Sequence, residues 1–198
     1  MDIVLDQLLA VREELTPALE ASRGVRLSLN DLLAKAVSAV LPEFRLLNAY
    51  VSDREVVLQP LVNLGVAVAS DRGLVVPVIR DAASLALPDL VGELKRLTSA
   101  ARQGTLAPDD LAGGTFTLSN LGMFGVRSFT AIVNPPQTAI LAVGGAREEV
   151  KLSARGLFVQ TVASFTLTCD HRAVDGALAA GFLKRLAELL EGPELRKL

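Results

Sequence analysis

Apolar residues recur every three or four positions in the first part of the chain, which is the period of an amphipathic helix. Residues 3–21 follow this period, and Pro17 within them predicts a kink or a restart of the helix. A second helix is expected over residues 28–41, because Ser28 is a favourable N-cap and Pro42 stops the run.

The period then changes to that of strands. Two hairpins are predicted, each made of two short apolar runs around a polar turn, and the second turns at Asp71-Arg72-Gly73. Its last run is almost wholly apolar and is expected to be covered on both faces, with Pro77 at an edge or a bulge because proline cannot donate to a ladder. The four runs are 48–51, 55–58, 64–69 and 74–79.

Helices and strands follow one another through the rest of the chain, with a glycine-rich loop over residues 120–126. The mixture predicts one α/β domain over residues 1–198, in which helices pack against a mixed sheet. The predicted helices are 87–103 and 174–190, and the predicted strands are 115–119, 139–143 and 158–169.

The composition is aliphatic. Apolar residues make up 51% of the chain, aromatic residues only 4%, and tryptophan is absent. No apolar run reaches the length of about 18 residues expected for a membrane span, and the N-terminus lacks the pattern of a signal peptide. The excess of aliphatic side chains is compatible with burial between subunits or with an aliphatic core.

Charge and side-chain inventory narrow the possible chemistry. The formal net charge is -2 without a basic run, which argues against a nucleic-acid or anionic-membrane surface. A single cysteine cannot form an internal disulfide, and one cysteine plus one histidine fall short of a structural zinc set, so no metal site is expected. Any acid-base chemistry by a histidine must use His171.

His171 lies between the last predicted strand and the last predicted helix, where side chains often reach a cleft. A histidine can take up and return a proton near neutral pH, although a structural role is the commoner one for a histidine taken alone. Asp175 likewise has a structural interpretation, as N-cap of the last helix, and Gly176 permits the turn.

Ser119 stands at the end of a predicted strand, before the glycine-rich loop. The segment lacks the spacing and the lysine of a phosphate-binding P-loop. A hydroxyl at such a place can donate to a developing oxyanion, whereas the segment read alone favours a plain polar loop residue.

Taken together, these segments resemble one family. His171 to Gly176 match the motif HxxxDG, and TFTLSNLGMFG at 115–125 and IVNPPQ at 132–137 precede it in that order. The set resembles the catalytic core of the dihydrolipoyl acyltransferase (E2) of 2-oxo acid dehydrogenase complexes, from about Leu5 to Leu198. The resemblance implies a chloramphenicol acetyltransferase-like two-layer sandwich, and SNLGMFG is most similar to the acetyl-transferring branch.

The resemblance also implies the reaction, in which an acyl group passes from a dihydrolipoyl thiol to coenzyme A. His171 would be the general base, Ser119 would stabilise the oxyanion, and Asp175 would hold the turn that bears the histidine. Coenzyme A would be a substrate, and the lipoyl group would be carried on a domain absent from this chain. The residues that contact coenzyme A are not indicated.

The implied partners are further copies of the chain. In the family, trimers share the site between neighbours and assemble into a cubic 24-mer or a dodecahedral 60-mer, to which the E1 and E3 components and the lipoyl domain are added. Subunit contacts would then bury the aliphatic excess, and a cytoplasmic or mitochondrial-matrix location is expected. The candidates for contact between trimers are Leu186, Leu189, Leu190, Leu195 and Leu198.

Residues 1–198 are thus expected to be an E2 core without the family's N-terminal segment and without lipoyl or subunit-binding domains. Two alternatives remain at this stage. One is a truncated or engineered self-assembling scaffold with little activity. The other is a stand-alone acyltransferase of the same superfamily.

Overall fold

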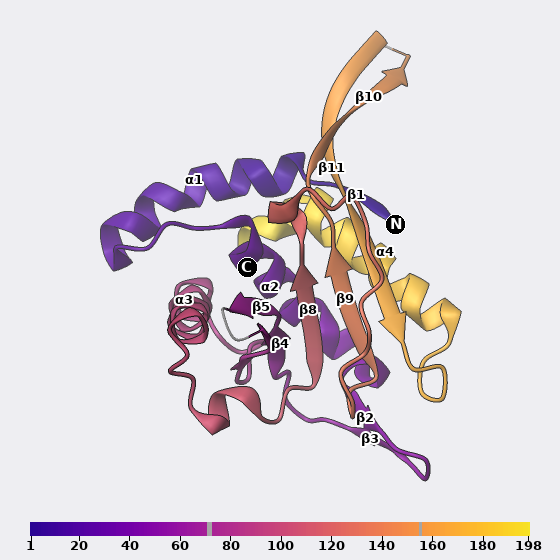
Figure 1. Ribbon diagram of the computed structural model, residues 1–198. Coiled ribbons are helices and arrows are strands. Elements are labelled where there is room, and N and C mark those ends of the chain that lie inside the picture. Colours follow the sequence, from indigo (N-terminus) through magenta and orange to yellow (C-terminus); the bar gives the residue numbers. More distant parts are fainter. Residues whose placement is uncertain (71–72, 155) are drawn as a thin grey trace.

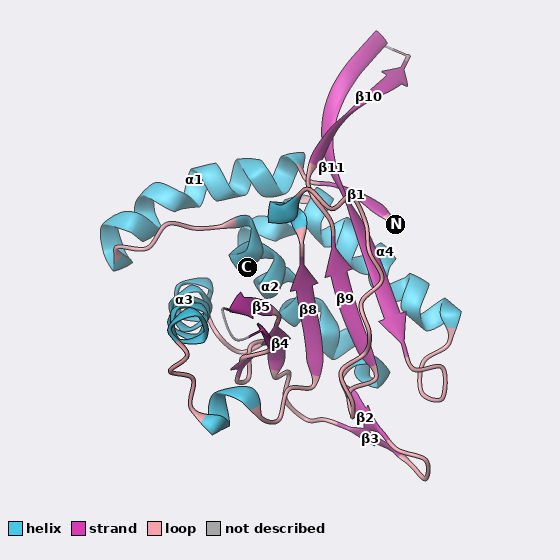
Figure 2. Ribbon diagram, in the orientation of Figure 1, coloured by secondary structure: helices cyan, strands magenta, loops and turns pink. Residues whose placement is uncertain are grey.

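The computed structural model describes residues 1–70, 73–154 and 156–198, which build two layers (Figures 1 and 2). One layer is a mixed sheet with strand order β1-β11-β9-β8-β4-β7, and β10 pairs with the first half of β11. In the other layer, α2 and α4 lie against the sheet, α1 packs on both of them, and α3 lies beside α2 and β5. The two-layer mixed α/β fold predicted from the sequence is confirmed.

The main sheet contains β1 (Asp2–Val4), β4 (Leu64–Val66), β7 (Val78–Ile79), β8 (Phe116–Asn120), β9 (Ala139–Val143), β10 (Arg147–Ser153) and β11 (Gly156–Cys169). Two hairpins stand apart from it, β2 (Ala49–Val51) with β3 (Val56–Leu58) and β5 (Val68–Ser70) with β6 (Gly73–Val75). The helices are α1 (Asp6–Arg23), α2 (Leu29–Val40), α3 (Leu87–Gln103) and α4 (Gly176–Glu191). Short 3-10 turns occupy Leu41–Glu43, Arg45–Leu47, Pro108–Leu111, Gly122–Phe124 and Pro193–Lys197.

The helix termini follow from local chemistry. At the start of α2, the Ser28 hydroxyl accepts from the backbone N–H of Asp31 at 3.2 Å, and the Asp31 carboxylate accepts from the Ser28 N–H at 2.6 Å. This reciprocal pair is a capping box, which satisfies N–H groups that the helix itself cannot. Both α1 and α3 end at a left-handed glycine, Gly24 and Gly104, where a side chain would be strained.

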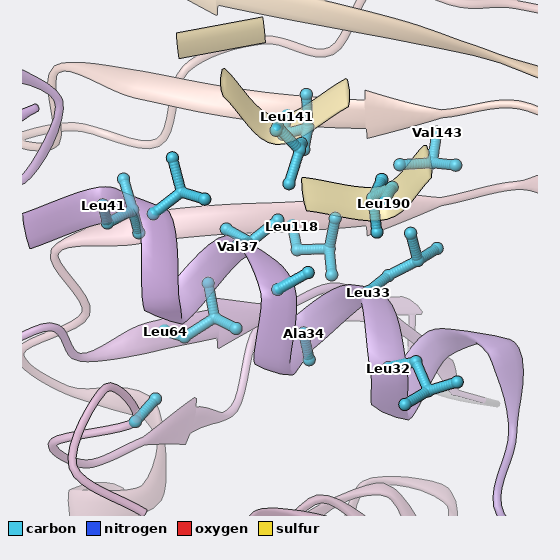
Figure 3. Close-up of a cluster of buried hydrophobic side chains, with 14 of the residues drawn as sticks. Leu32, Leu33, Ala34, Val37, Leu41, Leu64, Leu118, Leu141, Val143 and Leu190 are labelled. Carbon is cyan, nitrogen blue, oxygen red and sulfur yellow. The ribbon is translucent and has the colours of Figure 1, made fainter. Parts of the chain in front are cut away.

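The core lies between α2, α4 and the sheet. In β8, Phe116 and Leu118 are fully buried toward the helices, and the alternation of a strand turns Thr117 and Ser119 to the other face. Figure 3 shows the side chains of α2 meeting those of β8, β9 and α4. The residues labelled there are Leu32, Leu33, Ala34, Val37, Leu41, Leu64, Leu118, Leu141, Val143 and Leu190.

The N-terminal prediction needs a correction. The expected helix over 3–21 begins only at Asp6, because Asp2–Val4 pair with β11 as a strand and Ile3 is fully buried opposite Ala163. The helix then continues through Pro17 to Arg23. Long-range strand pairing has overridden the local period at the first few residues.

The strand predictions are right in place and incomplete in detail. Both hairpins are confirmed as antiparallel pairs, although the turn residues Asp71 and Arg72 lie outside the described residues. The run 74–79 is not covered on both faces, because it splits at Pro77 between β6 and the edge strand β7, and Leu74 is 72% exposed. The sequence analysis did not predict β10, which pairs with β11 in an exposed hairpin.

The leucines expected between trimers have a different role. Leu186, Leu189, Leu190 and Leu195 are buried within their own chain, and Leu198 packs against the same core. They are therefore not free to contact another trimer, and that prediction is wrong for the four buried leucines. Part of the aliphatic excess fills this core. Within the described residues, none of the helices combines the length and the apolar character that crossing a membrane requires.

Phe182 offers a test of the core. It is fully buried in α4, and its ring centroid lies 5.6 Å from that of Phe44 and 5.9 Å from that of Phe116. We expect Phe182→Ala to lower the free energy of unfolding by about 3–5 kcal/mol, because the cavity cannot collapse completely. Phe124→Ala, at a ring that is 65% exposed, should change it by about 0.5 kcal/mol or less. Urea titrations at one fixed protein concentration measure both, and equal losses would contradict this account of the core.

Candidate active site

Ser119 and His171 lie at opposite ends of the sheet. Ser119 is near the carboxyl end of β8, opposite Ala142 of β9, with which β8 is parallel. Because β11 is antiparallel to β9, its end at Cys169 lies opposite Ala139, the first residue of β9. Three residues along the strand and two strand spacings separate the two places, about 10 Å in each direction, and His171 lies farther still. The two side chains therefore do not meet within one chain. Figure 1 shows the carboxyl ends of β8 and β11 at opposite ends of the sheet.

Ser119 lies at a cavity of about 830 Å³. Its side chain points away from the helical layer and is 9% exposed. Among the described residues, no group exchanges a hydrogen bond with its hydroxyl. Besides Ser119, the walls come from β5, β6, the start of α2, the side of α3 that carries Lys95 and Arg102, and the loop that carries Met123 and Phe124.

The glycine-rich loop after Ser119 is shaped by close backbone approach. The side-chain oxygen of Asn120 accepts from the N–H of Gly122 at 2.8 Å, and Gly125 has a φ of 71°. A Cβ atom at Gly144, just after β9, would clash with the backbone carbonyl of Arg127. The loop thus lies directly on the end of the sheet, which keeps the position next to Ser119 defined.

The turn that bears His171 is held by polar contacts on both sides. The Asp170 N–H donates to the carbonyl of Thr138 at 2.8 Å. The Arg172 guanidinium donates to the carboxylates of Asp170 and Asp53, each at 2.7 Å, and so ties the turn to the β2–β3 hairpin. The hydrogen bonds from Arg172 lower the pKa of Asp170 to about 2. His171 itself is exposed to solvent.

Asp175 acts as the N-cap of α4. Its side chain accepts from the N–H of Leu178 at 2.8 Å, which is the structural interpretation that the sequence offered. The backbone carbonyls of the same turn accept from following N–H groups, among them that of Ala179. Asp175, four residues after His171, therefore sets where α4 begins.

The segment 126–137 runs along the sheet face that the helices leave free (Figure 1). Gln137 is buried there and accepts from the Thr117 hydroxyl at 2.6 Å. A cavity of about 440 Å³ lies beside the His171 turn, and the buried Thr168 hydroxyl at this cavity has no hydrogen-bond partner among the described residues. The IVNPPQ motif thus forms one wall of the space next to the histidine.

Sequence reasoning proposed the histidine, the serine and the aspartate as site residues but did not propose the residues that hold them in place. Asp53 and Thr168 belong to no motif, and Gln137 stood out only as the last residue of IVNPPQ. The contacts of all three depend on neighbours far away in the chain. For Asp53, the only feature of the sequence that could have drawn attention to it was the polar turn 52–54 of the first predicted hairpin.

Cys169 is not arranged as a nucleophile or as part of a metal site. It packs against the core, and burial raises the pKa of its thiol to about 11. The part of the chain that the structure describes contains no cluster of three or more His, Cys, Asp or Glu side chains that could hold a metal ion.

Solved structures define the class of fold. A chloramphenicol acetyltransferase aligns with a TM-score of 0.57 at 16% identity, which establishes the fold alone. The dihydrolipoamide acetyltransferase of Azotobacter vinelandii aligns over 100% of this chain and 82% of its own, with a TM-score of 0.94 and 32% identity. A structure of the cubic core of the pyruvate dehydrogenase multienzyme complex aligns equally well.

The family follows from the sequence comparison. The model of the 2-oxoacid dehydrogenases acyltransferase (catalytic domain) matches residues 1–198, so the chain belongs to this family. The acetyltransferase component 3 of the mitochondrial pyruvate dehydrogenase complex of Arabidopsis thaliana is 42% identical over 98% of this chain. The corresponding component of Rickettsia bellii is 38% identical over 96% of it. The chain spans 36% and 46% of the length of these two relatives. The resemblance inferred from the motifs is confirmed.

The cap at Asp175 can be tested by stability. Asp175→Ala should lower the free energy of unfolding by about 1 kcal/mol, because the Leu178 N–H loses its acceptor. Asp175→Asn should change it by only a few tenths of a kcal/mol, since asparagine caps helices about as well as aspartate. Urea titrations compare the two variants. A loss with asparagine as large as with alanine would show that the charge, and not the cap, is what matters.

The raised pKa of Cys169 predicts slow alkylation. At pH 8 a thiol with a pKa of about 11 has a thiolate fraction about 100-fold lower than a thiol with the ordinary pKa of 9.0. A more basic thiolate is also a better nucleophile, which offsets about tenfold of this difference. We therefore expect iodoacetamide to label the folded chain about tenfold more slowly than the urea-unfolded chain. Mass spectrometry follows the single adduct, with Cys169→Ser as background. Equal rates in the two states would exclude the raised pKa.

Proposed function

We propose that this chain transfers an acyl group, with acetyl favoured, from S-acyl-dihydrolipoyl-lysine to coenzyme A. One observation carries the proposal. A structural and enzymatic study of the Azotobacter vinelandii enzyme addressed the role of a serine, a histidine and an asparagine in its catalytic mechanism. In that enzyme the serine and the histidine are 52 residues apart, and the asparagine follows the histidine by four. Ser119, His171 and Asp175 have the same spacing.

The reaction needs a base because a free thiol, with a pKa of about 8.5, is mostly protonated at neutral pH. His171 removes the proton of the coenzyme A thiol, and the sulfur attacks the thioester carbonyl carbon. The carbonyl oxygen becomes an oxyanion, to which the Ser119 hydroxyl donates a hydrogen bond. When the intermediate collapses, the bond to the dihydrolipoyl sulfur breaks, and His171 returns the proton to that sulfur.

The site is proposed to form between copies of the chain. Within one chain, the places of Ser119 and His171 differ by about 10 Å along the strands and about 10 Å across them, whereas the reaction requires both residues at one carbonyl group. A neighbour that supplies the second residue resolves this conflict. The trimer that the family resemblance implies is a closed ring in which each copy gives one residue to one neighbour and receives the other residue from the next. The cubic core formed by a relative supports such trimers as the unit of a larger cage.

The remaining partners follow from the same family. The lipoyl group would arrive on a separate lipoyl domain, and E1 and E3 components would supply the acyl group and reoxidise the arm. Relatives include a bacterial and a mitochondrial protein, which supports a place in the cytoplasm or the mitochondrial matrix.

Single substitutions test the two catalytic roles. His171→Ala should reduce acetyl transfer from S-acetyl-dihydrolipoamide to coenzyme A by about 10²–10⁴-fold. Ser119→Ala should reduce it by about 10²–10³-fold, with the loss in kcat, because the hydrogen bond is made to the oxyanion. Ser22→Ala, at the exposed end of α1, is the matched control and should keep full activity. Unchanged turnover in the histidine variant would exclude this mechanism.

Mixing the two inactive variants tests whether the site is shared. In equal random mixtures of His171→Ala and Ser119→Ala chains, about a quarter of the interfaces should combine an intact serine with an intact histidine. Unfolding and refolding the variants together should then restore about a quarter of the wild-type activity. A site within one chain would restore none, because every chain would carry one defect.

A further inference from the structure

His171 depends on its backbone for its position. Within the described residues, the imidazole ring exchanges no hydrogen bond with any other group of its own chain. A base must lie within about 3 Å of the proton that it removes, so its place has to be set in another way. The turn that bears the histidine is therefore the part of the chain that fixes where the proposed base can lie.

The two neighbours of His171 fix the shape of this turn. The Asp170 carboxylate accepts from the backbone N–H of Arg172 at 3.0 Å and from its guanidinium at 2.7 Å. The Asp170 carbonyl accepts from the N–H groups of Ala173 and Val174 at 3.1 and 3.0 Å. All these contacts are local, so they hold the turn together but do not place it relative to the rest of the protein.

Besides the strand and the helix that flank it, two longer-range contacts place the turn. The first is the hydrogen bond from the Asp170 N–H to the carbonyl of Thr138 at 2.8 Å. The second joins Nη1 of Arg172 to the Asp53 carboxylate at 2.7 Å, across 119 positions of the chain. A planar guanidinium can bind two carboxylates at once in a fixed geometry, which suits Arg172 to this task.

The β2–β3 hairpin presents Asp53 on a defined turn. The Ser52 hydroxyl accepts from the N–H groups of the two residues that follow Asp53, at 3.3 and 3.2 Å. At the base of the hairpin, the Val51 N–H donates to the carbonyl of Pro136 at 2.8 Å. The Asp53 side chain is 96% exposed, and within the described residues Arg172 is its only partner. Such an exposed ion pair contributes little to global stability, so its effect on the turn can be measured separately from folding.

We propose that Asp53 is a positioning residue for the acyl transfer, because its ion pair with Arg172, here called the anchor, fixes the His171 turn to the β2–β3 hairpin. This inference rests on the proposed function, in which His171 is the base. Asp53 acts through Arg172, whose contacts with Asp170 pass the constraint to the backbone of the turn. Without the anchor the turn samples other positions, and the imidazole is correctly placed for only part of the time.

Kinetics at saturating substrate concentrations test this role in the full chain. An exposed ion pair shifts an equilibrium between two arrangements by up to about fivefold. We therefore expect Asp53→Ala to lower kcat for acetyl transfer about threefold to fivefold, while the KM for coenzyme A changes less than about twofold. Asp53→Glu keeps the carboxylate and should retain at least about half of the wild-type kcat.

The matched control is Glu55→Ala in the same hairpin. Glu55 is also exposed, and within the described residues its carboxylate forms no ion pair. This variant removes one negative charge from the hairpin and leaves the anchor intact, so it should keep the wild-type kcat.

A double-mutant cycle shows whether Asp53 acts through Arg172. Arg172→Ala should lower kcat about tenfold or more, because the turn loses both of its carboxylate contacts. Adding Asp53→Ala to that variant should then change kcat by less than about twofold. Losses that multiply in the double variant would show that the two residues act independently and would contradict the anchor.

Hydrogen exchange tests the turn without any substrate. The N–H groups of residues 172–174 all donate to Asp170, so their exchange reports how firmly the turn is held. Mass spectrometry should show that the peptide covering them exchanges about threefold to fivefold faster in Asp53→Ala than in the wild type. Glu55→Ala should exchange at the wild-type rate.

The two readouts separate the anchor from the reaction. Unchanged kcat or unchanged exchange in the folded Asp53→Ala variant would overturn the positioning role, and so would a loss confined to KM. A variant that loses the wild-type mass in light scattering would show that the pair acts on assembly, which also overturns it. A wild type without acyl transfer, in which Asp53→Ala still speeds exchange of the turn, would overturn the proposed function and leave the anchor standing.

Discussion

The opposite directions of β8 and β11 are the constraint on which the candidate site depends. Both strands lie in the centre of one sheet, with β9 between them, and their hydrogen bonds fix the register. The chain therefore leaves β8 at one end of the strands and leaves β11 at the opposite end. No side-chain rotation can overcome such a distance. Under the proposed function both residues act on one carbonyl group, which therefore requires two chains.

The supports of the two catalytic candidates are built differently, in a way that suits their roles. Ser119 is the end of a buried strand, and its position is set by the sheet and by the packing of the glycine-rich loop. His171 stands on an exposed turn, whose shape comes from charged contacts of Arg172 with Asp170 and Asp53 and from the cap at Asp175. A hydrogen-bond donor to an oxyanion benefits from a rigid frame. A base that exchanges a proton with two substrates benefits from access to both.

The aliphatic side chains lie in two settings. The interior between the helices and the sheet is filled with leucine, valine and alanine, with a few phenylalanines around α4. This core absorbs the leucines of the last helix. The apolar side chains that remain exposed are concentrated on β10 and the first half of β11, on the loop after Ser119 and near the His171 turn.

Local pattern was sufficient for several elements because their period and their caps are written in neighbouring residues. The helix after Ser28, the helix that ends at Gly104 and the strand Ala139–Val143 all lie where the sequence predicted them. The candidates Ser119, His171 and Asp175 were also proposed from local pattern, because they lie in segments that resemble the motifs of the family.

The tertiary structure alone decided the features that depend on distant partners. Asp2–Val4 became a strand because β11 offers hydrogen bonds to them, and the missed β10 is defined by its pairing with the same strand. Burial of Leu186 and Leu190 depends on the helices and strands that surround them. The sequence by itself determined which residues are the candidates for the chemistry. Only the folded sheet decided that Ser119 and His171 lie apart, because strand direction is a property of long-range pairing and not of any local period.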